Sequence, residues 1–108
     1  MTKTAAAMPS KILIAGFQAL SDPLRLRVLD LLREEECCVC DLCEVLAVSQ
    51  SKLSFHLKSL KEAQLVQTRQ EGRWIYYRLN LVQFEVLQEY LGDFGQLGQV
   101  VAARQCCE

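Results

Sequence analysis

Hydrophobic residues recur at helical spacing in the first third of the chain. Ile12, Leu13, Phe17 and Leu20 follow this repeat and predict an amphipathic helix. The Ser-Asp-Pro sequence at 21–23 ends that helix and begins another, because proline is favoured in the first turn of a helix. In the second helix, apolar residues alternate with charged ones, which is typical of a mostly buried helix whose charged side chains reach solvent. Two helices are therefore predicted before residue 37.

The next segment is predicted to form two helices joined by a short turn. One runs from about Val39 to Leu46 and the other from about Gln50 to Ala63. The connection of three residues is the length that joins the two helices of a helix-turn-helix, and Ser49 suits the N-cap of the second. We predict a helix-turn-helix over about residues 39–63. The residues expected on the core face of its second helix are Leu53, Leu57 and Leu60.

A β-rich segment follows the helix-turn-helix. Residues 65–70 and 73–79 flank Gly72 and are rich in β-branched and aromatic residues, which predicts a β-hairpin at about 65–79 with basic residues near its tip. From about 81 to 104 apolar positions again recur at helical spacing, although three glycines interrupt them. We predict one long C-terminal helix with a weak middle.

The composition is that of an ordinary globular protein. The chain has 108 residues, 51% of them hydrophobic and 23% charged, which suits one domain over residues 1–108. No apolar run approaches the roughly 18 residues that span a bilayer. The first ten residues lack the apolar core of a secretory signal. We expect a cytoplasmic protein without membrane association.

Charge is distributed unevenly along the chain. The net charge is -1, yet residues 49–80 carry six basic and two acidic residues, a local charge of +4. The distribution of charge, and not the net value, marks a nucleic-acid-binding surface. The helix-turn-helix and the hairpin are therefore predicted to bind DNA.

Four of the six cysteines lie within residues 37–43. In a reducing compartment, clustered thiols are more often metal ligands or redox centres than structural disulfides. Cys40 and Cys43 have C-x-x-C spacing, but the βαβ context of a thioredoxin-like motif is missing. Because there is also no set of nucleophile, base and orienting residue, we predict that the protein is not an enzyme.

The predicted order of elements is that of a mainly α winged helix-turn-helix with a β-hairpin wing. At this point four stretches resemble the ArsR/SmtB family of metalloregulatory repressors, and in particular its arsenic-responsive members. The cysteine string Cys-Val-Cys-Asp-Leu-Cys separates arsenic sensors from most of their relatives. The four stretches are residues 20–29, 38–43, 49–60 and 72–79.

The resemblance implies a homodimer that binds operator DNA and releases it when As(III) or Sb(III) binds cysteine thiolates. No organic cofactor is implied. The family pairs its subunits through the N- and C-terminal helices, and these helices carry more apolar residues here than one small core needs, which is typical of an interface. A two-fold dimer predicts double-stranded DNA with inverted half-sites.

Cys38, Cys40 and Cys43 are the predicted metalloid ligands. As(III) is soft and thiophilic, and thiolates are the ligands suited to soft centres. We also expect the start of a helix to lower the pKa of these thiols. Residues two apart on a helix point to nearly opposite sides, so closing the site should distort the first helix of the helix-turn-helix. Simple packing remains an alternative for Cys43.

The other thiols leave alternatives open. Cys37 is a bystander or an occasional substitute ligand, and Cys106 and Cys107 are an exposed pair or a second thiol site. The same DNA-binding module could sense Cd(II), Pb(II) or Zn(II), or it could respond to redox state through a disulfide. The single histidine, His56, counts against a zinc site built from histidines and carboxylates on the last helix.

DNA contacts are predicted from the helix-turn-helix and the hairpin. Gln50, Ser51 and Ser54 are candidates for hydrogen bonds to base edges in the major groove. Phe55 departs from the polar or basic residue that the family often has there, so we do not predict a contact for it. His56 is either DNA-proximal or a helix-packing residue. The other predicted DNA-binding residues, four of them phosphate contacts, are Ser49, Lys52, Lys58, Arg69 and Arg73. For each lysine, a solvated helix face is the alternative.

Trp74, Tyr76 and Tyr77 are predicted to pack in the wing and core instead of stacking on bases.

Overall fold

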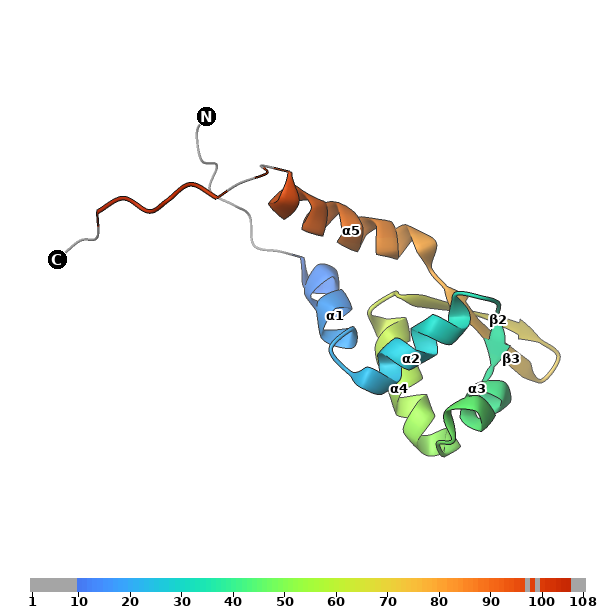
Figure 1. Cartoon of the computed structure of the whole chain (residues 1–108). Coiled ribbons are helices and arrows are strands. Elements are labelled where there is room, and N and C mark those ends of the chain that lie inside the picture. Colours follow the sequence, from blue (N-terminus) through green and yellow to red (C-terminus); the bar gives the residue numbers. More distant parts are fainter. Residues whose placement is uncertain (1–9, 97, 99, 106–108) are drawn as a thin grey trace.

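The computed structural model describes residues 10–96, 98 and 100–105. The fold is a winged helix-turn-helix, as predicted, with three strands in one small sheet (Figure 1). The elements in chain order are α1 (Lys11–Ala19), α2 (Pro23–Leu32), β1 (Cys37–Cys38), α3 (Val39–Leu46), α4 (Gln50–Glu62), β2 (Val66–Glu71), β3 (Trp74–Leu79) and α5 (Leu81–Gly95).

Side-chain caps fix where the helices begin. The Asp22 carboxylate accepts the backbone N–H groups of Leu24 and Arg25 at 2.8 and 3.1 Å, directly before Pro23 in the first turn of α2. The Ser49 hydroxyl accepts the Lys52 N–H at 3.2 Å and caps α4, as predicted. Each cap satisfies N–H groups that the helix itself leaves without partners. The predicted start of both helices is confirmed.

Two of the helices end at residues whose backbone has the left-handed conformation. Ala47 follows α3 with φ 55°, and Gln64 follows the C-cap of α4 with φ 62°. After each, a backbone N–H reaches back to the helix, from Val48 to the Cys43 carbonyl at 3.2 Å and from Leu65 to the Leu60 carbonyl at 3.0 Å. These are the bonds by which a left-handed residue stops a helix. The turn of the helix-turn-helix therefore depends on a conformation that favours glycine.

The sheet contains a strand that the sequence pattern did not predict. β2 and β3 form the predicted antiparallel hairpin, with Gly72 at φ 62° in its turn. β1 pairs antiparallel with the edge of β3 that faces away from β2, with Cys37 opposite Tyr77 and Cys38 opposite Tyr76. The strand order is therefore β1-β3-β2. A strand of two residues is too short to have a hydrophobic period, which is why only the fold reveals it.

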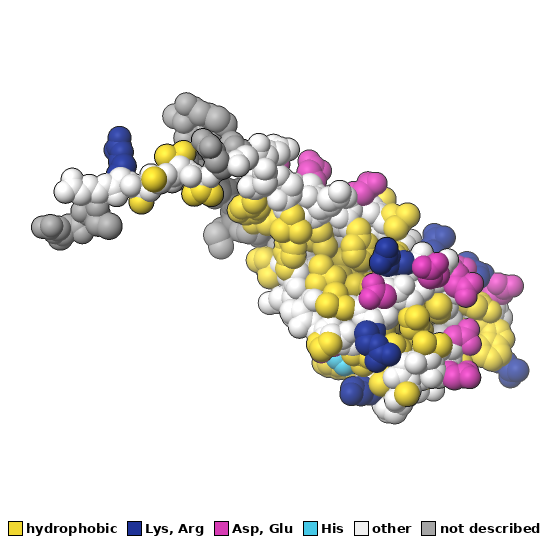
Figure 2. Space-filling model, viewed as in Figure 1, with side chains coloured by type: hydrophobic (Ala, Val, Ile, Leu, Met, Phe, Trp, Pro, Cys, Tyr) yellow, Lys and Arg dark blue, Asp and Glu magenta, His cyan; other side chains and the backbone are white. Residues whose placement is uncertain are grey.

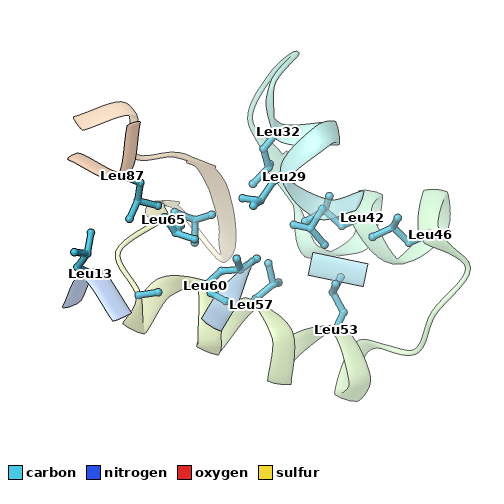
Figure 3. Close-up of a cluster of buried hydrophobic side chains, with 14 residues drawn as sticks. Leu13, Leu29, Leu32, Leu42, Leu46, Leu53, Leu57, Leu60, Leu65 and Leu87 are labelled. Carbon is cyan, nitrogen blue, oxygen red and sulfur yellow. The ribbon is translucent and has the colours of Figure 1, made fainter. Parts of the chain in front are cut away.

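The core is formed mainly by leucines, and these come from all five helices and from Leu65 (Figure 3). The predicted core face of α4 is confirmed, because Leu53, Leu57 and Leu60 are at most 1% exposed. Leu42 and Leu46 of α3 are buried beside them, and this packing fixes α3 against α4. At the other end Leu87 of α5 packs next to Gly16 of α1, where an added Cβ would lie 3.0 Å from a Leu87 methyl carbon.

The C-terminal helix is shorter than predicted. α5 ends at Gly95, and residues 98 and 100–105 have no regular secondary structure, so the predicted extent of about 81–104 is wrong. Gly92 and Gly95 each weaken a helix by about 1 kcal/mol relative to alanine, and Gly98 has φ 73°. Leu87 is also the one buried residue of α5, so packing does not offset this cost.

Within the described residues, no helix is long and apolar enough to cross a membrane.

Ala47→Gly tests the cost of the left-handed turn. We expect this variant to raise the free energy of unfolding by about 0.5 kcal/mol, because relief of the steric cost exceeds the added entropy of the unfolded chain. Urea denaturation followed by circular dichroism measures the change. Ala15→Gly in α1 is the control, and it should lower the free energy of unfolding by about 1 kcal/mol. A loss of stability in Ala47→Gly would contradict this account of the turn.

Candidate thiol site and nucleic-acid interface

The four clustered cysteines lie at the junction between β1 and α3. Cys37 and Cys38 form β1, and Cys38 is also the N-cap of α3, with an extended backbone (φ -83°, ψ 164°). Cys40 lies in the first turn of α3 and is exposed, whereas the other three thiols are partly buried. All four are free thiols. The predicted ligands therefore span a strand and a helix and do not share one regular element.

The three predicted ligands are not gathered into one set in this conformation. Among residues 10–96, 98 and 100–105, no three His, Cys, Asp or Glu side chains lie close enough together to hold a metal ion. Cys43 packs against the hydrophobic core, while Cys40 faces solvent. Binding of one ligand by Cys38, Cys40 and Cys43 together therefore requires a different arrangement of these thiols.

Burial controls the acidity of two of the thiols. Burial raises the pKa of Cys43, and the neighbouring Cys40 adds to the effect. Burial also raises the pKa of Cys37, with smaller contributions from Glu35 and Asp41. The prediction that the helix start would lower the thiol pKa is therefore wrong for Cys43. This residue lies beyond the first turn of α3, where the helix dipole has faded and desolvation dominates.

An ion pair ties the cysteine segment to the wing. Arg69 of β2 donates two hydrogen bonds to the Glu36 carboxylate, at 3.0 and 3.3 Å, and Glu36 directly precedes β1. Arg69 also donates to Glu71 at 2.6 Å, and its guanidinium carbon lies 4.7 Å from the centre of the Tyr76 ring. Tyr76 is the residue opposite Cys38 in the sheet.

These contacts shift the pKa values of both partners. The hydrogen bond from Arg69 lowers the pKa of Glu36, and the two carboxylates raise the pKa of Arg69 above its ordinary value. Arg69, predicted as a phosphate contact, is therefore engaged by two carboxylates in this conformation. Its partner Glu36 lies 33 residues away in sequence. Local sequence patterns do not encode such a pair.

The polar residues predicted to meet DNA lie on the surface of α4 and at its start. α4 packs with α2 and α3, and the hairpin lies at the opposite end of the molecule from the end of α5 (Figure 1). Arg73 is exposed in the hairpin turn, with its guanidinium carbon 5.7 Å from the centre of the Trp74 ring. Six predicted DNA contacts at the N-cap and along α4 are exposed: Ser49, Gln50, Ser51, Lys52, Ser54 and Lys58.

His56 has a packing role. Its side chain is buried, and Nδ1 accepts a hydrogen bond from Nε of Arg25 at 3.1 Å. The same nitrogen lies 3.8 Å from the carboxylate of Asp22, the residue that caps α2. His56 thus joins α4 to the start of α2. The sequence pattern does not predict the part played by Arg25, because its partner is 31 residues away.

The aromatic residues of the hairpin divide between surface and core. Tyr77 packs against the hydrophobic core and Tyr76 is half-buried beneath Arg69, as expected for packing residues. Trp74 is 46% exposed at the turn, so the prediction of a packing role does not hold for its outer part. Cys106 and Cys107 lie outside the described residues.

Comparison with known proteins agrees with this arrangement. The family described as "Bacterial regulatory protein, arsR family" matches residues 22–68, which run from the cap of α2 into β2. The arsenical resistance operon repressor of Staphylococcus xylosus is 48% identical over 73 residues, which are 68% of this chain and 70% of that protein.

The names of two further similar proteins also refer to arsenical resistance. The arsenical resistance operon repressor of Bacillus subtilis is 48% identical over 65 residues, 59% of this chain, and the match spans only 62% of that protein. A crystal structure of a possible transcriptional regulator for arsenical resistance superimposes with a TM-score of 0.68 at 34% identity, covering 74% of this chain and 83% of the other.

Glu36→Gln tests whether the ion pair stabilises the fold. We expect wild type to resist urea better than the variant at pH 7, because ionised Glu36 holds Arg69. The lowered pKa of Glu36 means that this difference is present above the ordinary glutamate pKa of about 4.3 and is lost as the pH falls through the still lower folded value. Urea midpoints at pH 7, 5, 4 and 3 provide the measurement. The control is Glu34→Gln, which changes an exposed residue. A difference that stays constant down to pH 3 would refute the role of the ion pair.

Proposed function

The chain belongs to the arsR family of bacterial regulatory proteins, and we propose that it is a transcriptional repressor that senses As(III) or Sb(III). In this proposal a homodimer binds operator DNA in the cytoplasm and dissociates when cysteine thiolates bind the metalloid. The observation that carries the proposal is the position of four free thiols at the junction that leads into the helix-turn-helix. The names of two similar repressors refer to arsenical resistance, which supports this choice of inducer.

DNA binding is assigned to α4 and the wing. The exposed Gln50, Ser51 and Ser54 lie in the N-terminal half of α4, the part of a recognition helix that meets base edges in the major groove. Lys52, Lys58 and Arg73 are exposed and supply positive charge for phosphates. Arg69 joins them only when Glu36 and Glu71 release it. His56 contributes by holding α4 in place, since its ring is buried against α2.

Dimerisation is assigned to the apolar faces of α1 and α5. Val86, Leu91 and Phe94 of α5 are 43%, 56% and 72% exposed, and Ile14 of α1 is 43% exposed. Apolar side chains gather over these two helices in Figure 2. A patch of this kind is typical of an interface, and a second copy would cover it symmetrically. Two recognition helices related by a two-fold axis require inverted half-sites.

The positions of the thiols support a mechanism for release. Cys38 is held opposite Tyr76 in the sheet, Cys40 faces solvent and Cys43 packs against the core. Thiolates are the preferred ligands of a soft metalloid, and gathering three of them would shift β1 and the start of α3. Because α3 positions α4 and β1 is paired with the wing, a ligand that stabilises the gathered state lowers the affinity for DNA.

Cys40→Ser tests the sensing mechanism. We expect the reduced variant to bind a DNA fragment from upstream of its own gene as tightly as wild type, because the Cys40 side chain is exposed. Arsenite should release wild type but not the variant, since one of three sulfur ligands is missing. Fluorescence anisotropy measures both steps. Cys37→Ser is the control and should still respond to arsenite; circular dichroism verifies that it is folded, since Cys37 packs against the core.

The same titration distinguishes the alternatives. Cadmium and zinc are added separately, and all samples are compared with and without reductant. Release of wild type by cadmium or zinc but not by arsenite would favour a divalent-metal sensor, and release only without reductant would favour a disulfide switch. A Cys40→Ser protein that dissociates at the same arsenite concentration as wild type would overturn the proposed ligand set.

A further inference from the structure

α4 carries one large apolar side chain on its outer surface. Phe55 is 63% exposed, whereas Leu53, Leu57 and Leu60 of the same helix are buried. Exposure of a phenyl ring to water is unfavourable, and the ring does not contribute to the core. In the middle of the predicted recognition helix, this ring is available for a contact outside the core.

Phe55 lies on the polar face of α4. Residues three or four apart share one face of a helix, so Ser51, Phe55 and Lys58 form a row on the side opposite the buried leucines. Ser51 and Lys58 are exposed, and the hydroxyl and the ammonium group both suit nucleic acid. The charge and polarity around Phe55 thus favour DNA over a protein partner with an apolar surface.

The ring of Phe55 has a supported orientation. Its centre lies 5.4 Å from the centre of the His56 ring, with an angle of 80° between the planes, which is an edge-to-face arrangement. His56 is itself held by the hydrogen bond from Arg25. A side chain backed by a fixed neighbour loses less entropy on binding than a free one.

We propose that Phe55 is a specificity-determining residue that contacts the C5-methyl group of a thymine in each half-site. This inference rests on the proposed function, because it requires α4 to enter the major groove. There the base edges present hydrogen-bond donors and acceptors, and the thymine methyl is the apolar group. A phenyl ring placed over a donor or acceptor would leave it without a partner, whereas a methyl group has no such partner to lose.

Deoxyuridine substitution tests the contact directly. Deoxyuridine differs from thymidine only by the missing methyl group, so each thymine of the upstream fragment is replaced in turn and binding of the reduced full chain is measured by fluorescence anisotropy. For wild type we expect one thymine position in each half-site at which the replacement weakens binding by about fourfold, the value of one buried methyl group.

Variants of the side chain complete the test. Phe55→Ala should bind the thymine fragment more weakly and should not distinguish it from the deoxyuridine fragment. Phe55→Leu keeps an apolar side chain and should retain part of the discrimination. The control Val45→Ala changes an exposed apolar residue of α3, 59% exposed, and should discriminate as wild type does. Circular dichroism verifies that each variant is folded.

The possible results separate this inference from the function on which it rests. If wild type binds the fragment specifically but no thymine position is sensitive, or if Phe55→Ala discriminates as well as wild type, the contact is refuted and the repressor proposal stands. If wild type binds the fragment no more tightly than unrelated DNA, both are refuted.

Discussion

The position of the thiols relative to the wing and the helix-turn-helix depends on the pairing of β1 with β3. This pairing involves only Cys37 and Cys38, opposite Tyr77 and Tyr76, and it is reinforced by the ion pair between Glu36 and Arg69. Because α3 begins at the residue after Cys38, the same pairing sets where the first helix of the helix-turn-helix starts. The thiols, the wing and the helix-turn-helix are therefore joined at one short strand.

This placement gives the proposed sensor a physical route from ligand to DNA. A strand of two residues has little pairing energy of its own, so the binding of a soft ion by three thiolates could compete with it. In the proposed mechanism, the buried leucines of α3 and α4 would transmit a shift of α3 to the recognition helix, because well-packed interfaces resist gradual deformation. Arg69 adds a second route, since movement of Glu36 would change the charge that the wing presents.

The elements that could be predicted from the sequence have a hydrophobic repeat or a helix-capping residue. The leucines of α4, Pro23 and Ser49 are local signals, and the structure agrees with them. β1 was not predicted because two residues have no period, and the pairs Glu36–Arg69 and Arg25–His56 join residues more than 30 positions apart. The end of α5 at Gly95 was missed because hydrophobic spacing continues past the point where packing within the chain stops. The residues proposed for the thiol site follow from the sequence string, but its ungathered geometry does not.

Hydrogen exchange of the reduced protein, measured by mass spectrometry with and without arsenite, tests the central claim most directly. If metalloid binding acts through the strand junction, arsenite will speed exchange in β1 and at whichever of Tyr76 and Tyr77 directs its N–H group toward β1. The amides around Leu57 and Leu60 in the core will stay protected. Arsenite that binds the protein, shown by its mass, yet leaves exchange in β1 and β3 unchanged would contradict the account.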